Sequence, residues 1–246
     1  MKYLILSDIH GNLEALQSAL SHVEGIKFDK YIVLGDLVGY GASPNEVVNL
    51  VREMDPLVVI RGNHDRVACG LADGSDFNHA ARDAALWTYE ELVPENRDYV
   101  SLLPHGPVEV DGLFDIVHGA PWHEDYYIFQ WREAYAALQR SDKALIFFGH
   151  THIPIIWTLG DGMIGGQGIT DGKYEYPLEK GKRYLINPGS VGQPRDSNPQ
   201  AGLAILDTDE MKMQFFRIDY NIEGAQKRIR RAGLDRFLAE RLAAGR

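Results

Sequence analysis

Aspartate, asparagine and histidine residues recur at five separate places in the sequence, each directly after a short apolar run. The five groups are Asp8-Ile9-His10, Gly35-Asp36, Gly62-Asn63-His64-Asp65, His118-Gly119 and Gly149-His150-Thr151-His152. They offer carboxylate, amide and imidazole ligands without thiolate, a set that suits Mn, Fe, Zn, Ni or Co in a five- or six-coordinate site. Because there are more ligands than one ion can take, we expect two divalent ions about 3.5–4 Å apart, bridged by a carboxylate.

The apolar runs that precede these groups predict strands that are buried on both faces. They cover residues 3–6, 31–34, 57–60, 113–117 and 145–148, and each is solidly apolar rather than alternating. Helical patterns cover 12–20, with Asn12 as a possible cap, and 44–53, where Pro44 and a Ser43 to Glu46 capping box mark the start. A helix between two strands favours parallel pairing. The loops of an open α/β sheet gather beyond the carboxyl ends of its strands, so the five groups should meet at one edge.

Two divalent ions at such an edge favour hydrolysis of a phosphate ester. The pair would hold a water as hydroxide at neutral pH and clamp the phosphoryl oxygens during in-line attack. Positive charge at those oxygens is what most lowers the barrier of this slow reaction. We expect His64, directly after Asn63, to protonate the leaving alkoxide or stabilise charge on it, an effect worth about 10² to 10⁴ in rate.

The ordered set of motifs from Asp8 to His152 resembles the signature of the calcineurin-like metallophosphoesterases. Residues 186–192, Ile-Asn-Pro-Gly-Ser-Val-Gly, and the closing helical tail are similar to the compact bacterial branch of this family, which includes small phosphodiesterases and dinucleoside polyphosphate hydrolases. The resemblance implies a four-layer α/β sandwich, in which two mixed sheets face each other and helices cover the outside. It also implies one domain over residues 1–246, with a helical tail from about residue 222.

The same resemblance implies a role for each candidate site residue. One ion is held by Asp8, His10 and His152, the other by Asn63, His118 and His150, and Asp36 bridges the two. His64 is then the catalytic imidazole, and Asn63 also touches the substrate phosphate. Manganese is the favoured metal, with iron, zinc, nickel or cobalt as alternatives.

Residues Gly39-Tyr40-Gly41 depart from the pattern of the family's protein phosphatases. In those enzymes an aspartate that orients the catalytic histidine and an arginine that grips phosphate stand at the matching positions. A monoester dianion gains most from that guanidinium, so the departure favours a phosphodiester or a phosphoanhydride such as a dinucleoside polyphosphate. Arg195 and Arg61 are candidates for supplying the charge, and Arg195 is the preferred substrate contact. Phosphomonoesterase or protein phosphatase activity, or a non-catalytic interaction scaffold, are the alternatives.

Composition excludes several other classes of protein. The chain has 246 residues, 45% hydrophobic and 24% charged, as in an ordinary folded protein. Its net charge of −10 argues against an extended nucleic-acid surface, so the expected partner is a small phosphorylated substrate such as a nucleotide. Cys69 is the single cysteine, which excludes an internal disulfide and favours a reducing compartment. The apolar runs are too short for a membrane span or a signal-peptide core, and we expect a cytoplasmic protein.

The sequence also gives expectations for residues and segments outside the ligand groups. His22, His79 and His105 lie outside the strand-end pattern and are expected at the surface, whereas the loop residue His123 is a candidate substrate contact. The glycine-rich stretch 160–183 predicts a hairpin with a loose tip. A second hairpin is expected from 203–206 and 213–216. The tail from Ile222 to about Ala244 should be helical, with a break near Gly233.

Overall fold

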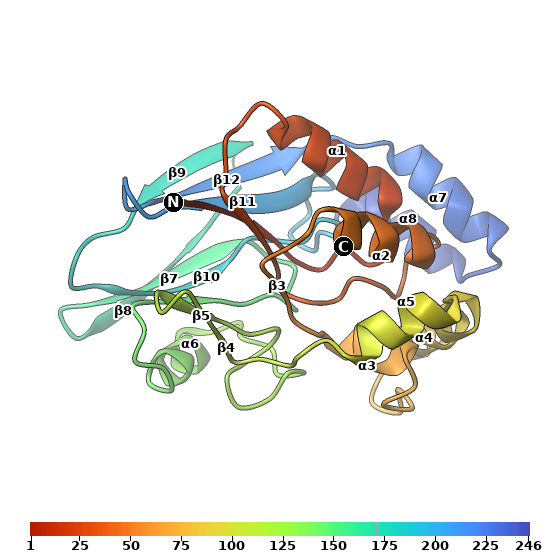
Figure 1. Cartoon of the computed structure of the whole chain (residues 1–246), viewed down its shortest axis with the longest axis horizontal. Helices are drawn as coiled ribbons and strands as arrows, with labels where there is room; N and C mark the ends of the chain where they lie inside the picture. Colours follow the sequence, from red (N-terminus) through yellow and green to blue (C-terminus); the bar gives the residue numbers. More distant parts are fainter. Residues whose placement is uncertain (171) are drawn as a thin grey trace.

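The computed structural model describes residues 1–170 and 172–246, and its strands form two six-stranded sheets (Figure 1). The first sheet contains, from edge to edge, β3 (Val58–Val59), β2 (Lys30–Val33), β1 (Lys2–Leu6), β11 (Ala201–Asp207), β12 (Lys212–Ile218) and β9 (Lys173–Pro177). The second contains β4 (Val108–Val110), β5 (Phe114–Ile116), β6 (Leu145–Phe147), β10 (Arg183–Asn187), β7 (Ile155–Gly160) and β8 (Met163–Gly168).

Both sheets are mixed. β1 pairs in parallel with β2, and β2 with β3, because the helices α1 (Leu13–Val23) and α2 (Pro44–Glu53) form the crossovers between them. In the second sheet β5, β6 and β10 are parallel neighbours. The remaining pairs are antiparallel, as between β1 and β11. The loops that follow the parallel strands of each sheet therefore all lie at the carboxyl ends of those strands.

Helices cover the outer faces of the two sheets, which completes the four-layer α/β sandwich that the sequence predicted. α1 and α2 pack on the first sheet, and α6 (Trp131–Leu138) packs on the second. The other helices are α3 (Asn63–Ala68), α4 (His79–Glu91), α5 (Pro94–Ser101), α7 (Ile222–Arg231) and α8 (Arg236–Ala244). In Figure 1, α7 and α8 lie at the same end of the molecule as α3, α4 and α5.

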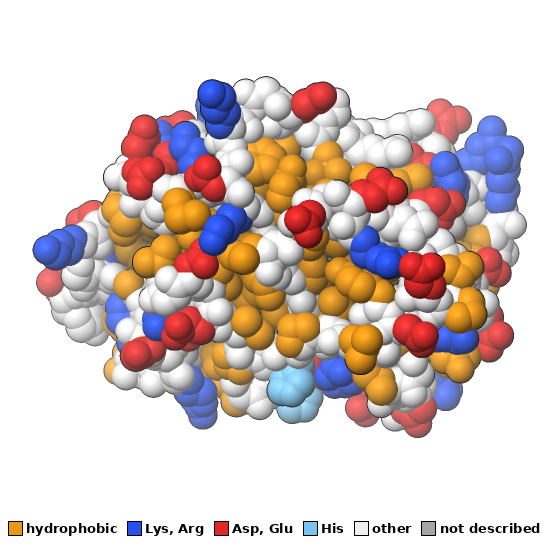
Figure 2. All heavy atoms as spheres, viewed as in Figure 1, with side chains coloured by type: hydrophobic (Ala, Val, Ile, Leu, Met, Phe, Trp, Pro, Cys, Tyr) orange, Lys and Arg blue, Asp and Glu red, His pale blue; other side chains and the backbone are white. Residues whose placement is uncertain are grey.

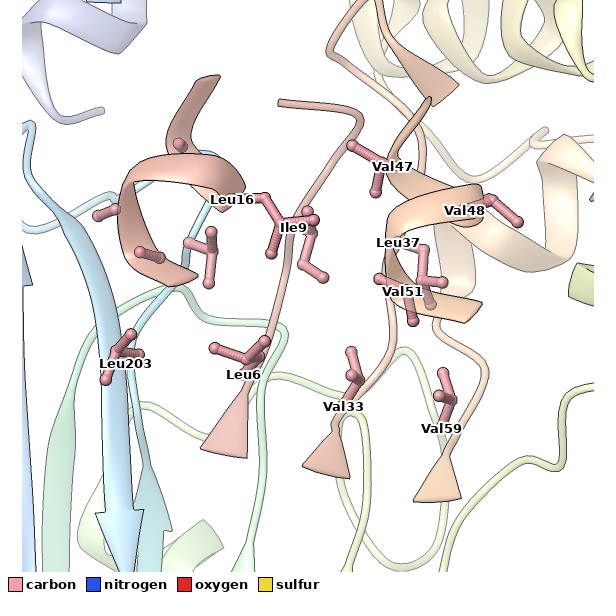
Figure 3. Packing of buried hydrophobic residues seen from close by; sticks show 14 of the residues in the cluster. Leu6, Ile9, Leu16, Val33, Leu37, Val47, Val48, Val51, Val59 and Leu203 are labelled. Carbon is pink, nitrogen blue, oxygen red and sulfur yellow. The ribbon is translucent and has the colours of Figure 1, made fainter. Parts of the chain in front are cut away.

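The side-chain alternation of the strands explains why their sequences are solidly apolar. On β1, Tyr3 and Ile5 point into the core between the two sheets, whereas Leu4 and Leu6 point toward the helices. Figure 3 shows the helix-facing side, where Leu6 and Val33 lie below α1 and α2. All of these side chains are buried, and full burial of one such side chain is worth about 1.5–3 kcal/mol. The two cores fix the strands, and the strands fix the loops at their ends.

Most of the expected elements are present, with two corrections. α1 has the Asn12 cap, and α7 and α8 are separated at Gly233, which has a φ of +73°. β11 and β12 form the expected hairpin. The hairpin expected within 160–183 is present only in part: β7 and β8 form a hairpin that turns at Asp161-Gly162, whereas β9 joins β12 in the other sheet, so the segment crosses between the sheets. Position 171, inside that stretch, lies outside the described residues.

The second correction concerns the start of α2. Its bounds agree with the expectation, but Ser43 makes no side-chain capping hydrogen bond, and its buried hydroxyl has no partner among the described residues. Pro44 at the first position starts the helix without the capping box.

The surface carries charges of both signs. On the face shown in Figure 2, acidic and basic side chains are interspersed and separated by apolar and neutral areas. No helix of the described chain is long and apolar enough to cross a membrane.

Candidate metal centre

Main-chain hydrogen bonds join four of the five ligand-bearing loops in two pairs. The Asp8 amide donates to the Gly35 carbonyl at 3.1 Å, and the His10 amide donates to the Asp36 carbonyl at 2.9 Å. Gly149 donates to the His118 carbonyl at 2.8 Å. Five of the seven candidate ligands adopt a positive φ of 50–63°: Asp8, His10, Asp36, His150 and His152. Non-glycine residues rarely adopt this conformation, and such strain clusters at functional sites.

Two groups of ligand atoms form inside this loop cluster, and one residue belongs to both. The first group is Asp8, His10, Asp36 and His152, and the second is Asp36, His118 and His150, with the atoms of each group within 4.8 Å of one another. All six side chains are buried. Asn63 joins the second group, because its Oδ1 lies 3.1 Å from His118 Nε2.

The spacing of these atoms fits the coordination shell of a divalent ion. His10 Nε2 lies 3.1 Å from His152 Nε2, and His152 Nε2 lies 3.3 Å from Asp8 Oδ1. Asp36 Oδ2 lies 3.5 Å from His10 Nε2 and 3.3 Å from His118 Nε2. Ligands bound at about 2.0–2.2 Å around one ion are separated by about 3.0–3.5 Å. The buried His/Asp cluster is therefore arranged as a divalent metal centre.

Main-chain carbonyls fix the tautomer of the four histidines that are candidate ligands. The Nδ1 atom of His10 lies 3.1 Å from the Val38 carbonyl, and that of His118 lies 2.8 Å from the Leu34 carbonyl. The Nδ1 atom of His152 lies 2.6 Å from the Gln193 carbonyl. His150 is reversed, because its Nε2 lies 3.1 Å from the Asp125 carbonyl. Each contact places the ring proton on the nitrogen facing the carbonyl, which leaves Nε2 of three histidines and Nδ1 of His150 for a metal.

Backbone amides and hydroxyls orient the two carboxylates. The His64 amide donates to Asp36 Oδ1 at 2.9 Å, and the His150 amide lies 3.2 Å from both Asp8 oxygens. Ser7 donates its hydroxyl to Asp8 Oδ2 at 2.6 Å. Burial opposes the ionised form of Asp36, but the imidazoles of His118, His64 and His10 together outweigh it and lower the Asp36 pKa. Both carboxylates are thus held for binding a cation.

The environment of His64 differs from that of the ligand histidines. Among the described residues, its buried Nδ1 has no hydrogen-bond partner. Its ring is held instead between the rings of Tyr40, at 4.2 Å between centroids, and Phe77, at 4.5 Å. Gly39 packs so closely that a Cβ there would lie 2.6 Å from Nδ1. Burial lowers the His64 pKa to about 4, with Asp36 opposing and Arg195 adding to the shift.

The other residues singled out by sequence lie at varied distances from this centre. Arg195 lies at its edge, because its Nη2 lies 3.3 Å from the hydroxyl of Tyr40, whose ring is 4.7 Å from that of His10. Arg61 instead pairs with Glu124 at 3.3 Å. His123 is exposed and accepts a hydrogen bond from the Asp125 amide within its own turn. The surface placement of His22, His79 and His105 is confirmed.

Sequence reasoning missed Phe77, which packs on His64, and two further side chains beside the centre. Tyr127 stacks on His150 with centroids 3.9 Å apart, and the guanidinium of Arg241, on α8, lies 5.7 Å from the ring of Tyr40. The position of Tyr127 could have indicated that it lies near the centre, because its loop follows the candidate ligand His118. Arg241 carried none, because it lies about 90 residues beyond the last ligand motif.

A buried carboxylate–imidazole cluster at the loop edge of a four-layer α/β sandwich defines a metal-dependent phosphoesterase. A model of the calcineurin-like phosphoesterase superfamily domain matches residues 1–211. The chain belongs to this superfamily. It is 37% identical to the protein MJ0912 of Methanocaldococcus jannaschii over 244 residues, covering 98% of this chain and 97% of the relative.

Two further comparisons agree. The chain is 23% identical to the phosphodiesterase YfcE of Escherichia coli K12 over 222 residues, or 87% of this chain and 91% of YfcE. The crystal structure of a metallophosphoesterase from Sphaerobacter thermophilus is 39% identical and superposes with a TM-score of 0.88, covering 100% of this chain and 99% of that one.

Proposed function

We propose that the protein hydrolyses a phosphodiester or a phosphoanhydride of a nucleotide-like molecule with the help of two divalent metal ions. The observation that carries this proposal is the place of Asp36 in both ligand groups. A carboxylate common to two groups of ligands is what a pair of ions about 3.5–4 Å apart requires. The comparison with YfcE, named a phosphodiesterase, supports the substrate class.

Each ion would be held by residues from one group. Asp8, His10 and His152 would hold the first, Asn63, His118 and His150 the second, and Asp36 both. The ions supply a water nucleophile at neutral pH and neutralise charge on the phosphoryl oxygens. Because these ligands follow the general affinity order, the metal in the cell depends on availability, and manganese is the one we propose.

His64 and Asn63 act on the substrate itself. The two residues begin α3, and the amide of His64 is fixed to Asp36, so both are positioned by the centre. His64 would hold the proton at the oxygen of the leaving group, and the Asn63 amide group would donate to the substrate phosphate. The rings of Tyr40 and Phe77 fix the imidazole and exclude water from it.

Arg195 would bind a substrate phosphate. Its guanidinium is half-buried, and its hydrogen bonds go to the neutral groups Gln193 Oε1, at 2.9 Å, and the Tyr40 hydroxyl. In the described part of the chain it has no aspartate or glutamate partner within 4 Å. A guanidinium held this way keeps its charge available for an anion.

We also propose a cytoplasmic location and a single domain over residues 1–246.

The test is a substrate panel on protein loaded with Mn, Ni, Co, Mg or Zn. Bis-p-nitrophenyl phosphate and diadenosine tetraphosphate should be turned over in preference to p-nitrophenyl phosphate. Asp36→Asn and His150→Ala should abolish turnover, whereas the matched surface variants Asp83→Asn and His79→Ala should keep it, because those side chains only pair with each other at the surface. A monoester preference above about tenfold, or 1.4 kcal/mol, would contradict the substrate class. Unchanged turnover in both site variants would exclude the centre.

A further inference from the structure

Two arginines from distant parts of the chain lie beside the same aromatic ring at the edge of the centre. Arg195 follows β10, and Arg241 lies on α8 in the helical tail. Their guanidinium carbons are 5.6 Å and 5.7 Å from the centroid of the Tyr40 ring. That ring in turn contacts His10, at 4.7 Å, and His64, at 4.2 Å. One ring therefore lies beside both guanidinium groups, the candidate ligand His10 and the proposed catalytic imidazole.

The charges of both arginines are uncompensated by acidic side chains. Across residues 1–170 and 172–246, neither guanidinium lies within 4 Å of an aspartate or glutamate oxygen. Arg241 donates from Nε to the main-chain oxygen of Arg246, and its side chain also hydrogen-bonds to Tyr40. Arg236 on the same helix is 84% exposed and pairs with Glu240 at 3.4 Å. On α8, the exposed arginine pairs with an acidic side chain, and in the described part of the chain the partly buried one does not.

Two partly buried like charges near one another repel unless an anion lies between them. In agreement, burial and the neighbouring Arg195 lower the pKa of Arg241 to about 10. A guanidinium presents a planar fork of N–H donors that matches phosphate oxygens. The arrangement is thus suited to an anion with several oxygens that enters next to the metal centre.

Resting on the proposed function, we propose that Arg195 and Arg241 together bind a second phosphate, next to the one that is hydrolysed. The phosphate at the metal centre already has two divalent ions, Asn63 and His64 to stabilise it. Two more guanidinium groups exceed what one singly charged diester needs, and they match the added charge of a neighbouring phosphate. The substrate class is then a phosphoanhydride with at least two linked phosphates, as in a nucleoside polyphosphate. Arg241 lies outside residues 1–211, the part that matches the superfamily model.

The test compares the binding of orthophosphate with that of imidodiphosphate, whose P–N–P bridge resists hydrolysis. Calorimetry on manganese-loaded protein, dialysed free of excess metal, should give imidodiphosphate an affinity at least tenfold higher. In Arg241→Gln this ratio should fall by at least tenfold, and Arg241→Lys, which keeps the charge but not the fork, should lie between. Arg236→Gln, which removes the same charge from the exposed side of α8, should keep the wild-type ratio.

The outcomes separate this inference from the proposed function. A wild-type ratio below about two overturns the second phosphate site, whether or not the variants fold. An equal fall in Arg236→Gln and Arg241→Gln also overturns it, because the effect would then be general electrostatics. Failure of the proposed function appears elsewhere, as absence of turnover in the substrate panel, and the binding ratio can be measured in either case.

Discussion

The packing of Gly39 against His64 predicts a measurable effect of a single added methyl group. At Gly39 φ is +86°, where an alanine costs about 1–2 kcal/mol. The new Cβ would lie 2.6 Å from His64 Nδ1, and forcing extra volume into a packed site costs about 1–3 kcal/mol. Gly39→Ala should therefore lower the free energy of unfolding by about 2–5 kcal/mol, measured by urea denaturation. It should also displace the imidazole and lower turnover of bis-p-nitrophenyl phosphate toward that of His64→Ala, about 10² to 10⁴ below wild type.

Gly162→Ala is the matched control for this experiment. Gly162 has a φ of +74°, but nothing lies within 4 Å of its added Cβ, so only the backbone strain of about 1–2 kcal/mol applies. Turnover should stay at the wild-type level. The reasoning is refuted if Gly39→Ala is as stable as Gly162→Ala and its kcat stays within about threefold of wild type while His64→Ala is inactive. Close packing would then not be what positions the imidazole.

Three other perturbations test the centre and its supports. Divalent metal at one hundred times its Kd should stabilise the protein by about 2.7 kcal/mol, raising the Tm in calorimetry by about 5–10 °C for a chain of this size; an unchanged Tm would mean that the cluster binds no ion. Arg66→Ala removes the ion pairs to Glu124 and Asp125 that hold the carbonyl facing His150, so calorimetric titration should show about 10- to 100-fold weaker metal binding. The exposed variant Arg132→Ala should keep the wild-type affinity, and an equal loss in both would contradict this account. Gly192→Ala would drive its Cβ into the Ile9 carbonyl and should lower the free energy of unfolding by more than about 4 kcal/mol. The control Gly25→Ala has open space around its Cβ and should cost less than about 1 kcal/mol. Similar denaturation midpoints for the two variants would disprove the clash.

The ligand types and the strands that carry them could be predicted because both depend on local sequence. Solid apolar runs of four or five residues indicate strands with two buried faces. β1 is an example, because its residues Tyr3 and Leu6 are buried on opposite faces of the sheet. Asn12 caps α1 by contacting an amide three residues away, so its signal also lies within one short window. The four-layer fold followed from the resemblance that these motifs carry in order.

Only the tertiary structure decided which groups orient and surround the centre. The tautomer of His152 depends on its contact with the carbonyl of Gln193. Because every residue has the same main-chain carbonyl, no pattern of side chains predicts this contact. The incomplete expectation for 160–183 has a similar cause: β9 pairs with β12, which lies later in the chain, although β8 is nearer in sequence and is also an edge strand. Arg241 lies beside Tyr40 only because α8 packs against a part of the chain that is distant in sequence. Contacts between residues two hundred positions apart arise from packing of whole layers, and local sequence does not encode them.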